Sequence, residues 1–176
     1  MISVGEFYPS VGLPAAQAHH LRQVTVDAAQ VICVENPTSF YELIRHKNLA
    51  KDSVSSQGLL AAICLWGNPS PACRHLLRCL VSDLPEGVPL FVWADIDYGG
   101  LNILAQLREQ ISLHAAPYRM DVATLEAHAS WARPLTPADA QNLTRLTRRP
   151  TLSDMRPLID HMLQRGLKLE QEAIVL

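Results

Sequence analysis

Residues 88–101 read VPLFVWADIDYGGL. The first seven of these residues are nearly all apolar, which is typical of a short strand buried on both faces of a parallel sheet. The run ends at Asp95, and two glycines then lead into a helical pattern in which Leu101, Leu104 and Leu107 share one face. The stretch therefore predicts a buried strand that ends in an acidic loop and is followed by a helix.

Similar apolar runs occur elsewhere in the chain. Two precede this stretch and a weaker one follows it, at residues 31–34, 59–66 and 113–118. A helical pattern at 38–45, which Thr38 or Ser39 could cap, follows the first run, and Ser70 opens a helix after the second. This alternation predicts an α/β fold with a parallel, Rossmann-like sheet of four strands flanked by helices.

The two ends of the chain differ from this α/β core. Residues 1–29 are mixed in character, with one helical pattern (AAQAHHLRQV), and we interpret them as a lead-in or the remnant of an N-terminal region. Residues 30–176 are predicted to form the α/β domain with a helical C-terminal extension. In that extension Thr136 starts one helix, and Ser153 caps another that closes at Gly166.

Composition narrows the classes of function. The chain has 176 residues, 48% of them hydrophobic, and a formal net charge of −2, so no overall basic field draws it onto nucleic acid. No signal-peptide pattern and no apolar run of bilayer length is visible, which predicts a cytoplasmic location. The four cysteines lack zinc-ligand spacing, and the histidines show no His-x-x-x-His pair or cysteine partner. We therefore expect reduced thiols and no metal site built from His or Cys.

Three acidic residues follow the apolar runs at the points where the strands end. Glu35 comes after the first run, and Asp95 and Asp97 come after the third. Because the carboxyl ends of parallel strands meet at one edge of a sheet, where α/β proteins bind ligands, we expect these carboxylates to converge. Their mutual repulsion favours a bound cation, and Mg²⁺ prefers oxygen ligands. Turn formation and helix capping are the alternative roles for these residues.

Several longer segments of sequence support the predicted carboxylate site. They are VICVENP at 31–37, WGNPSP at 66–71 and WADIDYGGL at 93–101. These segments resemble the Toprim domain, in the branch found in the A subunit of topoisomerase VI, the meiotic double-strand-break protein and the Wadjet subunit JetD. The C-terminal domain of JetD-like proteins is the most similar, and PYRMD at 117–121 and LEQE at 169–172 match the same branch. The resemblance covers the chain from about residue 30 onward.

The resemblance implies a Toprim fold in which Glu35, Asp95 and Asp97 hold Mg²⁺, with Mn²⁺ as a substitute, and are the catalytic residues of DNA cleavage. It implies an endonuclease that belongs to a JetD-like system of defence against plasmids and foreign DNA. The nucleophile would be a metal-activated water, whereas the topoisomerase relatives use a tyrosine. Implied partners are DNA, an SMC-type complex or a separate DNA-binding subunit, and a second copy of the chain. A non-catalytic Toprim-like domain that docks on DNA or on a partner is the alternative.

Further candidate residues also have ordinary structural explanations. Glu170 and Glu172 stand two apart, so in an extended tail both would face one way and could form a second metal site or a base; a solvated strand face is the alternative. Candidates for contact with phosphate or DNA are Gly67, Asn68, Gly99, Gly100, Arg119, Arg145 and Arg149. The alternative roles are turns, close helix packing and surface ion pairs. For Arg145 and Arg149 the alternative is a solvated helix end, on which the two side chains would share a face.

Overall fold

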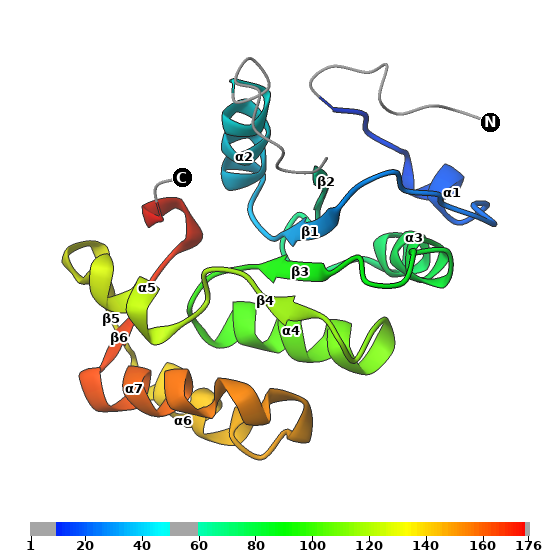
Figure 1. Cartoon of the computed structure of the whole chain (residues 1–176). Helices are drawn as coiled ribbons and strands as arrows, with labels where there is room; N and C mark the ends of the chain where they lie inside the picture. Colours follow the sequence, from blue (N-terminus) through cyan, green and yellow to red (C-terminus); the bar gives the residue numbers. More distant parts are fainter. Residues whose placement is uncertain (1–9, 50–59, 175–176) are drawn as a thin grey trace.

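A parallel sheet of four strands in the order β2-β1-β3-β4 forms the centre of the molecule (Figure 1). The computed structural model describes residues 10–49 and 60–174, so Leu59, the first residue of the apolar run at 59–66, lies outside the described residues. The strands are β1 (Gln30–Val34), β2 (Leu60–Cys64), β3 (Leu90–Trp93), β4 (Ala116–Pro117) and, in a separate antiparallel pair, β5 (Arg133–Pro134) and β6 (Leu167–Lys168). The predicted α/β fold with a parallel sheet of four strands is confirmed.

Helices lie on both faces of this sheet, with α2 on one face and α4 on the other (Figure 1). The helices are α1 (Ala15–Ala18), α2 (Pro37–Leu49), α3 (Pro71–Ser82), α4 (Tyr98–Gln110), α5 (Val122–Ala127), α6 (Pro137–Leu146) and α7 (Arg156–Arg165), with 3₁₀ segments η3 (Ala129–Trp131), η4 (Pro150–Met155) and η5 (Gln171–Ala173). Helix α6 packs against α4, and α7 packs against α6. In the described ranges no helix is both long enough and apolar enough to cross a membrane.

Pairing between β1 and β3 aligns their carboxyl ends. Val34 pairs with Trp93, and the last residues of both strands are buried. Glu35 directly follows β1, and Asp95 comes two residues after the end of β3. The aligned strand ends therefore bring Glu35 and Asp95 close together.

Three of the predicted helix boundaries are confirmed. The Ser70 hydroxyl accepts a hydrogen bond from the backbone N–H of Cys73 at 3.2 Å, at the start of α3. Thr136 and Asp139 form a reciprocal capping box at the start of α6. Gly166, with a φ of 67°, ends α7 in the left-handed conformation that glycine adopts without steric cost.

Other boundaries differ from the prediction. Neither Thr38 nor Ser39 caps α2, because the side chain of Asn36 accepts the Thr38 N–H at 2.7 Å and the helix begins one residue earlier, at Pro37. Ser153 does not cap α7, because it lies within η4. Of the helical pattern predicted at residues 15–24, Ala15–Ala18 form a helix.

The segment after α1 is held by side chains of α3. The Nε2 atom of His75 lies 2.8 Å from the backbone oxygen of Leu21, and the Cys79 thiol lies 3.6 Å from the same Nε2. His75 and Cys79 stand four apart, so they share a face of α3. The expectation that no histidine has a cysteine partner is therefore wrong, and this pair connects residues before β1 to the core.

Candidate functional site

Glu35 and Asp95 meet at the carboxyl edge of the sheet. The backbone N–H of Glu35 donates to the Trp93 oxygen at 2.9 Å, which continues the β1–β3 pairing by one residue. The backbone N–H of Asp95 in turn donates to Oε2 of Glu35 at 3.1 Å. The first of the predicted acidic residues is therefore joined directly to the loop that carries the other two.

Asp97 occupies the N-cap position of α4. Its Oδ1 atom accepts the backbone N–H of Gly100 at 2.8 Å, so a helix-capping role, given above as the alternative for these acids, holds for this residue. The same bond takes the Gly100 amide that was a candidate for phosphate contact. An added Cβ at Gly100 would lie 2.1 Å from the Asp95 oxygen, so close packing of the helix on the loop requires this glycine.

A segment near the C-terminus closes over the two carboxylate-bearing strand ends. Ile96, between the two aspartates, forms a pair of backbone hydrogen bonds with Leu169, at 2.9 and 3.1 Å. Gln171 follows this bridge and is fully buried. Its backbone N–H donates to Oδ1 of Asp95 at 2.7 Å, its Oε1 accepts the Asn36 N–H at 2.9 Å, and its Nε2 donates to the Trp93 oxygen at 3.2 Å.

Gln171 therefore connects the ends of β1 and β3 through its backbone and both ends of its amide. The sequence-based reasoning did not single it out, although it lies within the LEQE segment that carries the family resemblance. Asn36 was missed in the same way. Besides capping α2, it donates from Nδ2 to Oε1 of Glu172 at 2.5 Å.

Replacing Gln171 with alanine should lower the free energy of unfolding by about 2–3 kcal/mol, because the Asn36 N–H loses its partner, the Trp93 oxygen loses one of its two, and a fully buried side chain is removed. Chemical denaturation measures this loss. Gln164 is an exposed glutamine on α7, so Gln164→Ala is the matched control and should change stability little. Equal stability of the two variants would contradict the connecting role of Gln171.

The carboxylates lie close to one another and to other negatively charged side chains. Burial, followed by the negative charge of Glu35, raises the pKa of Asp95 to about 7, although the N–H of Gln171 acts in the opposite direction. Burial also raises the pKa of Glu35, and the charges of Asp97 and Glu172 add to that rise. The folded protein therefore holds like charges together at this edge, and a bound cation would relieve their repulsion.

The three carboxylates retain oxygen atoms, the type of donor that Mg²⁺ prefers. One oxygen each of Glu35, Asp95 and Asp97 accepts a backbone N–H, which leaves the second oxygen of each carboxylate for another partner. Among residues 10–49 and 60–174, no group of three or more His, Cys, Asp or Glu side chains is placed so that it could hold a metal ion. Mg²⁺ usually binds through one or two carboxylates and keeps several waters, so it does not need a closed protein cage.

The two glutamates of the tail take different partners. Glu170 forms an ion pair with Arg133 at 2.5 Å, between the segments that carry β5 and β6. Glu172 instead binds Asn36, and its charge contributes to the raised pKa values of Glu35 and Asp95. The segment forms the 3₁₀ turn η5, so the extended tail on which both glutamates would face one way is not present.

The outer strands also end at this edge. After β2, the backbone N–H of Gly67 donates to the Glu35 oxygen at 3.0 Å, and Asn68 is exposed in the following turn. After β4, Arg119 stacks on Tyr118, with its guanidinium carbon 5.7 Å from the ring centroid. Gly67, Asn68 and Arg119 thus follow strands of the same sheet as the acidic residues.

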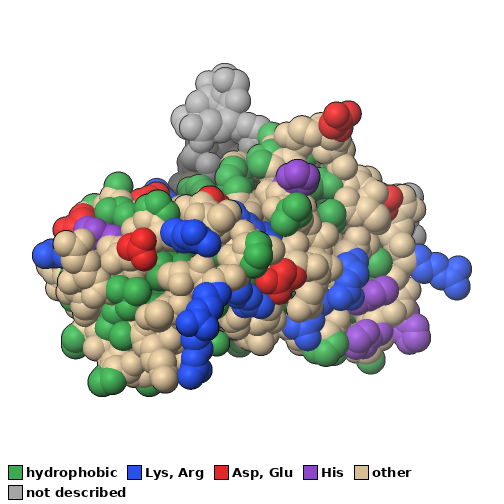
Figure 2. All heavy atoms as spheres, turned by 90° about the horizontal axis from the view of Figure 1, so that it is seen from below, with side chains coloured by type: hydrophobic (Ala, Val, Ile, Leu, Met, Phe, Trp, Pro, Cys, Tyr) green, Lys and Arg blue, Asp and Glu red, His purple; other side chains and the backbone are tan. Residues whose placement is uncertain are grey.

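Arg145 and Arg149 lie elsewhere. Helix α6 ends at Leu146, so the two arginines do not share a helix face. Arg149 pairs with Glu109 of α4 at 2.9 Å and also donates to Asn102. Figure 2, which looks at the molecule from below, shows Lys and Arg side chains interspersed with acidic ones on this face. Arg149 therefore connects to α4, whereas Arg145 is exposed and donates to Asn142 within α6 at 3.3 Å.

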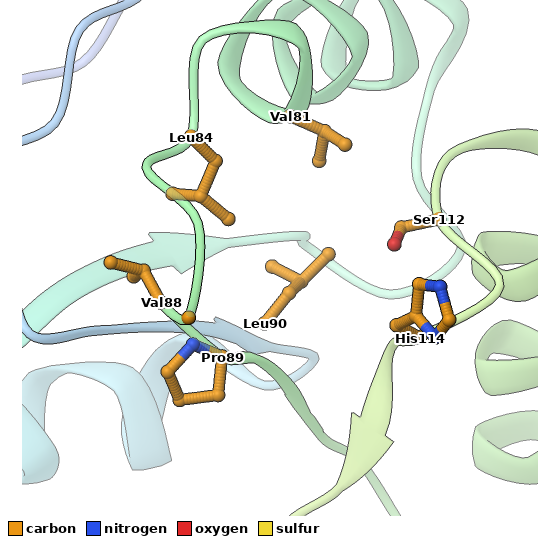
Figure 3. Close-up of a pocket in the computed structure, with 8 residues that line it drawn as sticks. Val81, Leu84, Val88, Pro89, Leu90, Ser112 and His114 are labelled. Carbon is orange, nitrogen blue, oxygen red and sulfur yellow. The ribbon is translucent and has the colours of Figure 1, made fainter.

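A pocket of about 420 Å³ lies around the start of β3, at the opposite end of the sheet (Figure 3). It is lined mainly by apolar side chains around the start of β3, with Ser112 and His114 from the segment before β4. None of the predicted site residues lines it. The carboxylates lie outside this pocket, at the carboxyl edge of the sheet, and their side chains are half-buried.

The fold and site define a class: an α/β domain with an acidic cluster at the carboxyl edge of a parallel sheet. The chain belongs to the family described as "Wadjet protein JetD, C-terminal", whose model matches residues 10–176. It is 27% identical, over 175 residues, to the Wadjet protein JetD of Bacillus cereus (strain Q1). That alignment covers 99% of this chain but 40% of the relative, so the chain spans less than half of that protein's length. The predicted resemblance to the JetD C-terminal type is confirmed; the wider link to Toprim and topoisomerase VI stays a prediction.

Proposed function

We propose that this chain is a divalent-metal-dependent DNA endonuclease domain that works within a Wadjet system. The observation that carries the proposal is the meeting of Glu35 and Asp95 at the carboxyl edge of the sheet, next to Asp97. Membership of the JetD C-terminal family supports the assignment to Wadjet. Defence against plasmids or foreign DNA, and assembly with an SMC-type complex or a separate DNA-binding subunit, belong to the same proposal.

In this proposal Glu35, Asp95 and Asp97 hold Mg²⁺, or Mn²⁺ in its place, through the oxygens that do not accept backbone N–H groups. When bound, the metal supplies a Lewis acid for a phosphate oxygen and lowers the pKa of a bound water. The residues of the chain position this centre: Gln171 fixes Asp95, and the Gly100 amide fixes Asp97. Arg119, at the end of β4, is suited to hold a backbone phosphate of the DNA. We propose water rather than a tyrosine as the nucleophile.

The test combines calorimetry of Mg²⁺ and Mn²⁺ binding with a plasmid-nicking assay on the same samples. The wild-type chain should bind the metal and cut, and Asp95→Ala/Asp97→Ala should do neither. Glu170→Gln is the matched control, since it removes a carboxylate from the same tail that pairs with Arg133 instead of facing the cluster. It should bind and cut as the wild type does.

The outcomes separate the two functions considered. Metal binding without cutting, in the presence of plasmid alone, would point to a missing partner subunit or to a domain that docks on DNA or a partner. Absence of metal binding by the wild-type chain would remove the nuclease proposal and leave the acidic residues as capping and turn-forming groups.

A further inference from the structure

An exposed tryptophan stands beside the acidic cluster. Trp66 follows β2, the strand next to β1, and its side chain is 74% exposed. Large aromatic side chains are mostly buried in folded proteins because they remove so much apolar surface from water. Trp131, in η3, is exposed to a similar degree (72%), so the position of Trp66 next to the acidic residues, and not exposure alone, singles it out as a contact for a partner.

The backbone at Trp66 is strained and held in place. Its φ of 58° lies in the left-handed region, which bulky side chains rarely adopt. Hydrogen bonds on either side fix this conformation: the Leu65 N–H donates to the Val34 oxygen at 2.8 Å, and the Gly67 N–H donates to the Glu35 oxygen at 3.0 Å. The indole thus projects from a rigid base that is bonded to the backbone of an acidic site residue.

A second residue with a left-handed backbone follows the outer strand on the other side of the sheet. Within the described residues, the non-glycine positions with positive φ are Trp66 and Arg119. They follow β2 and β4, the two outer strands, and the acidic residues follow the two central strands. Backbone strain concentrates at functional sites, where the surrounding structure maintains it for a purpose. The carboxyl edge therefore presents, in order, an indole, the carboxylates and a guanidinium.

The surroundings of Trp66 favour a nucleobase over an apolar protein surface. Asn68 and Ser70, next to it in the loop, are exposed and polar, while Pro69 between them is buried. A protein-docking site would present several apolar side chains together, whereas a single aromatic face next to polar groups is how proteins stack unpaired bases. Neighbouring strands lie about 4.8 Å apart, so the indole is within a few nucleotides' reach of the carboxylates.

We propose that Trp66 is a stacking platform for an unpaired nucleobase of the strand that crosses the carboxylate edge. This inference rests on the proposed action on DNA and adds the form of the substrate: a single-stranded or locally unpaired segment beside the phosphate to be cut. Stacking on Trp66 would hold that segment in register with Glu35 and Asp95.

The experiment titrates a 12-nucleotide oligothymidylate into the full chain with Ca²⁺ in place of Mg²⁺. In a Trp131→Phe background, Trp66 is the exposed tryptophan and Trp93 is buried, so quenching of tryptophan fluorescence reports stacking on Trp66. Trp66→Ala, followed by anisotropy of a labelled strand, should weaken binding about 5- to 150-fold, and Trp66→Phe should retain most of the affinity. A 12-nucleotide strand of abasic sites should bind wild type and Trp66→Ala alike.

A further variant tests the strain. Trp66→Gly should be at least as stable to heat as the wild type, since glycine adopts a φ of 58° without steric cost, and should bind the oligonucleotide as weakly as Trp66→Ala. This variant also separates loss of binding from loss of folding.

Wild-type affinity of Trp66→Ala for the oligonucleotide, or equal binding of the abasic strand by the wild-type chain, would overturn the proposal. Either result would leave a protein contact as the explanation for the exposed ring. Saturable quenching by a chain that never cuts DNA would keep the platform and remove the nuclease function. Normal cutting by Trp66→Ala with unchanged affinity would remove the platform alone.

Discussion

Gly100→Ala should lose about 4 kcal/mol or more of unfolding free energy, enough to leave much of the chain unfolded or insoluble. The added Cβ would lie 2.1 Å from the oxygen and 2.8 Å from the nitrogen of Asp95, and 3.0 Å from Cβ of Ala94. These neighbours are mostly backbone and are tied to β3, so they cannot move aside. Separating them would shift α4 away from the loop that carries the acidic residues. Thermal unfolding and yield of soluble protein measure the effect.

Gly99→Ala is the matched control. Its new Cβ would meet the Asp97 side chain at 3.2 Å, and alanine is the better helix former by about 1 kcal/mol. This variant should therefore fold with a stability close to that of the wild type. If Gly100→Ala proved as stable as Gly99→Ala, the close approach of α4 to the Asp95 backbone would be wrong.

Asp95→Asn should make the metal-free protein more stable at pH 8, by on the order of 2–4 kcal/mol, and change its stability little near pH 4. The pKa of Asp95 is raised from 3.8 to about 7, so between these values the folded state binds more protons than the unfolded chain. The contribution of this carboxyl to stability is thus greatest at low pH and is lost as the pH rises through that window. Asparagine carries no charge, and its oxygen can still accept the Gln171 N–H.

Urea denaturation in EDTA between pH 4 and 8.5 measures the difference between the two proteins. Asp160→Asn, which removes an exposed carboxylate from α7, controls for the change in net charge and should show no such pH-dependent gain. Added Mg²⁺ should then stabilise the wild type and not Asp95→Asn. A stability difference that is the same at every pH would contradict the raised pKa.

The sequence predicted the features that depend on local pattern. The apolar runs located the four strands, and the serine, threonine and glycine signals located the ends of α3, α6 and α7. The position of the acids after buried strands also predicted that Glu35 and Asp95 would meet, and the register of β1 with β3 explains why they do.

The remaining features depend on contacts between distant residues. Gln171 is 135 positions from Asn36, and no local periodicity marks a glutamine whose amide joins two strand ends. The left-handed backbone of Trp66 is similarly imposed by hydrogen bonds to β1 and its following residue. Asn36, rather than Thr38, caps α2 because Pro37 occupies the first helical position, and proline at that position is a helix-start signal that the sequence carries.

The bridge between Ile96 and Leu169 sets the order in which the site forms during synthesis. β1, β3 and α4 leave the ribosome long before Gln171, and contacts between segments so far apart in sequence form late. Until then Asp95 lacks the N–H that counters its repulsion from Glu35. A nascent chain therefore carries an incomplete acidic cluster until the segment around Gln171 has docked on the ends of β1 and β3.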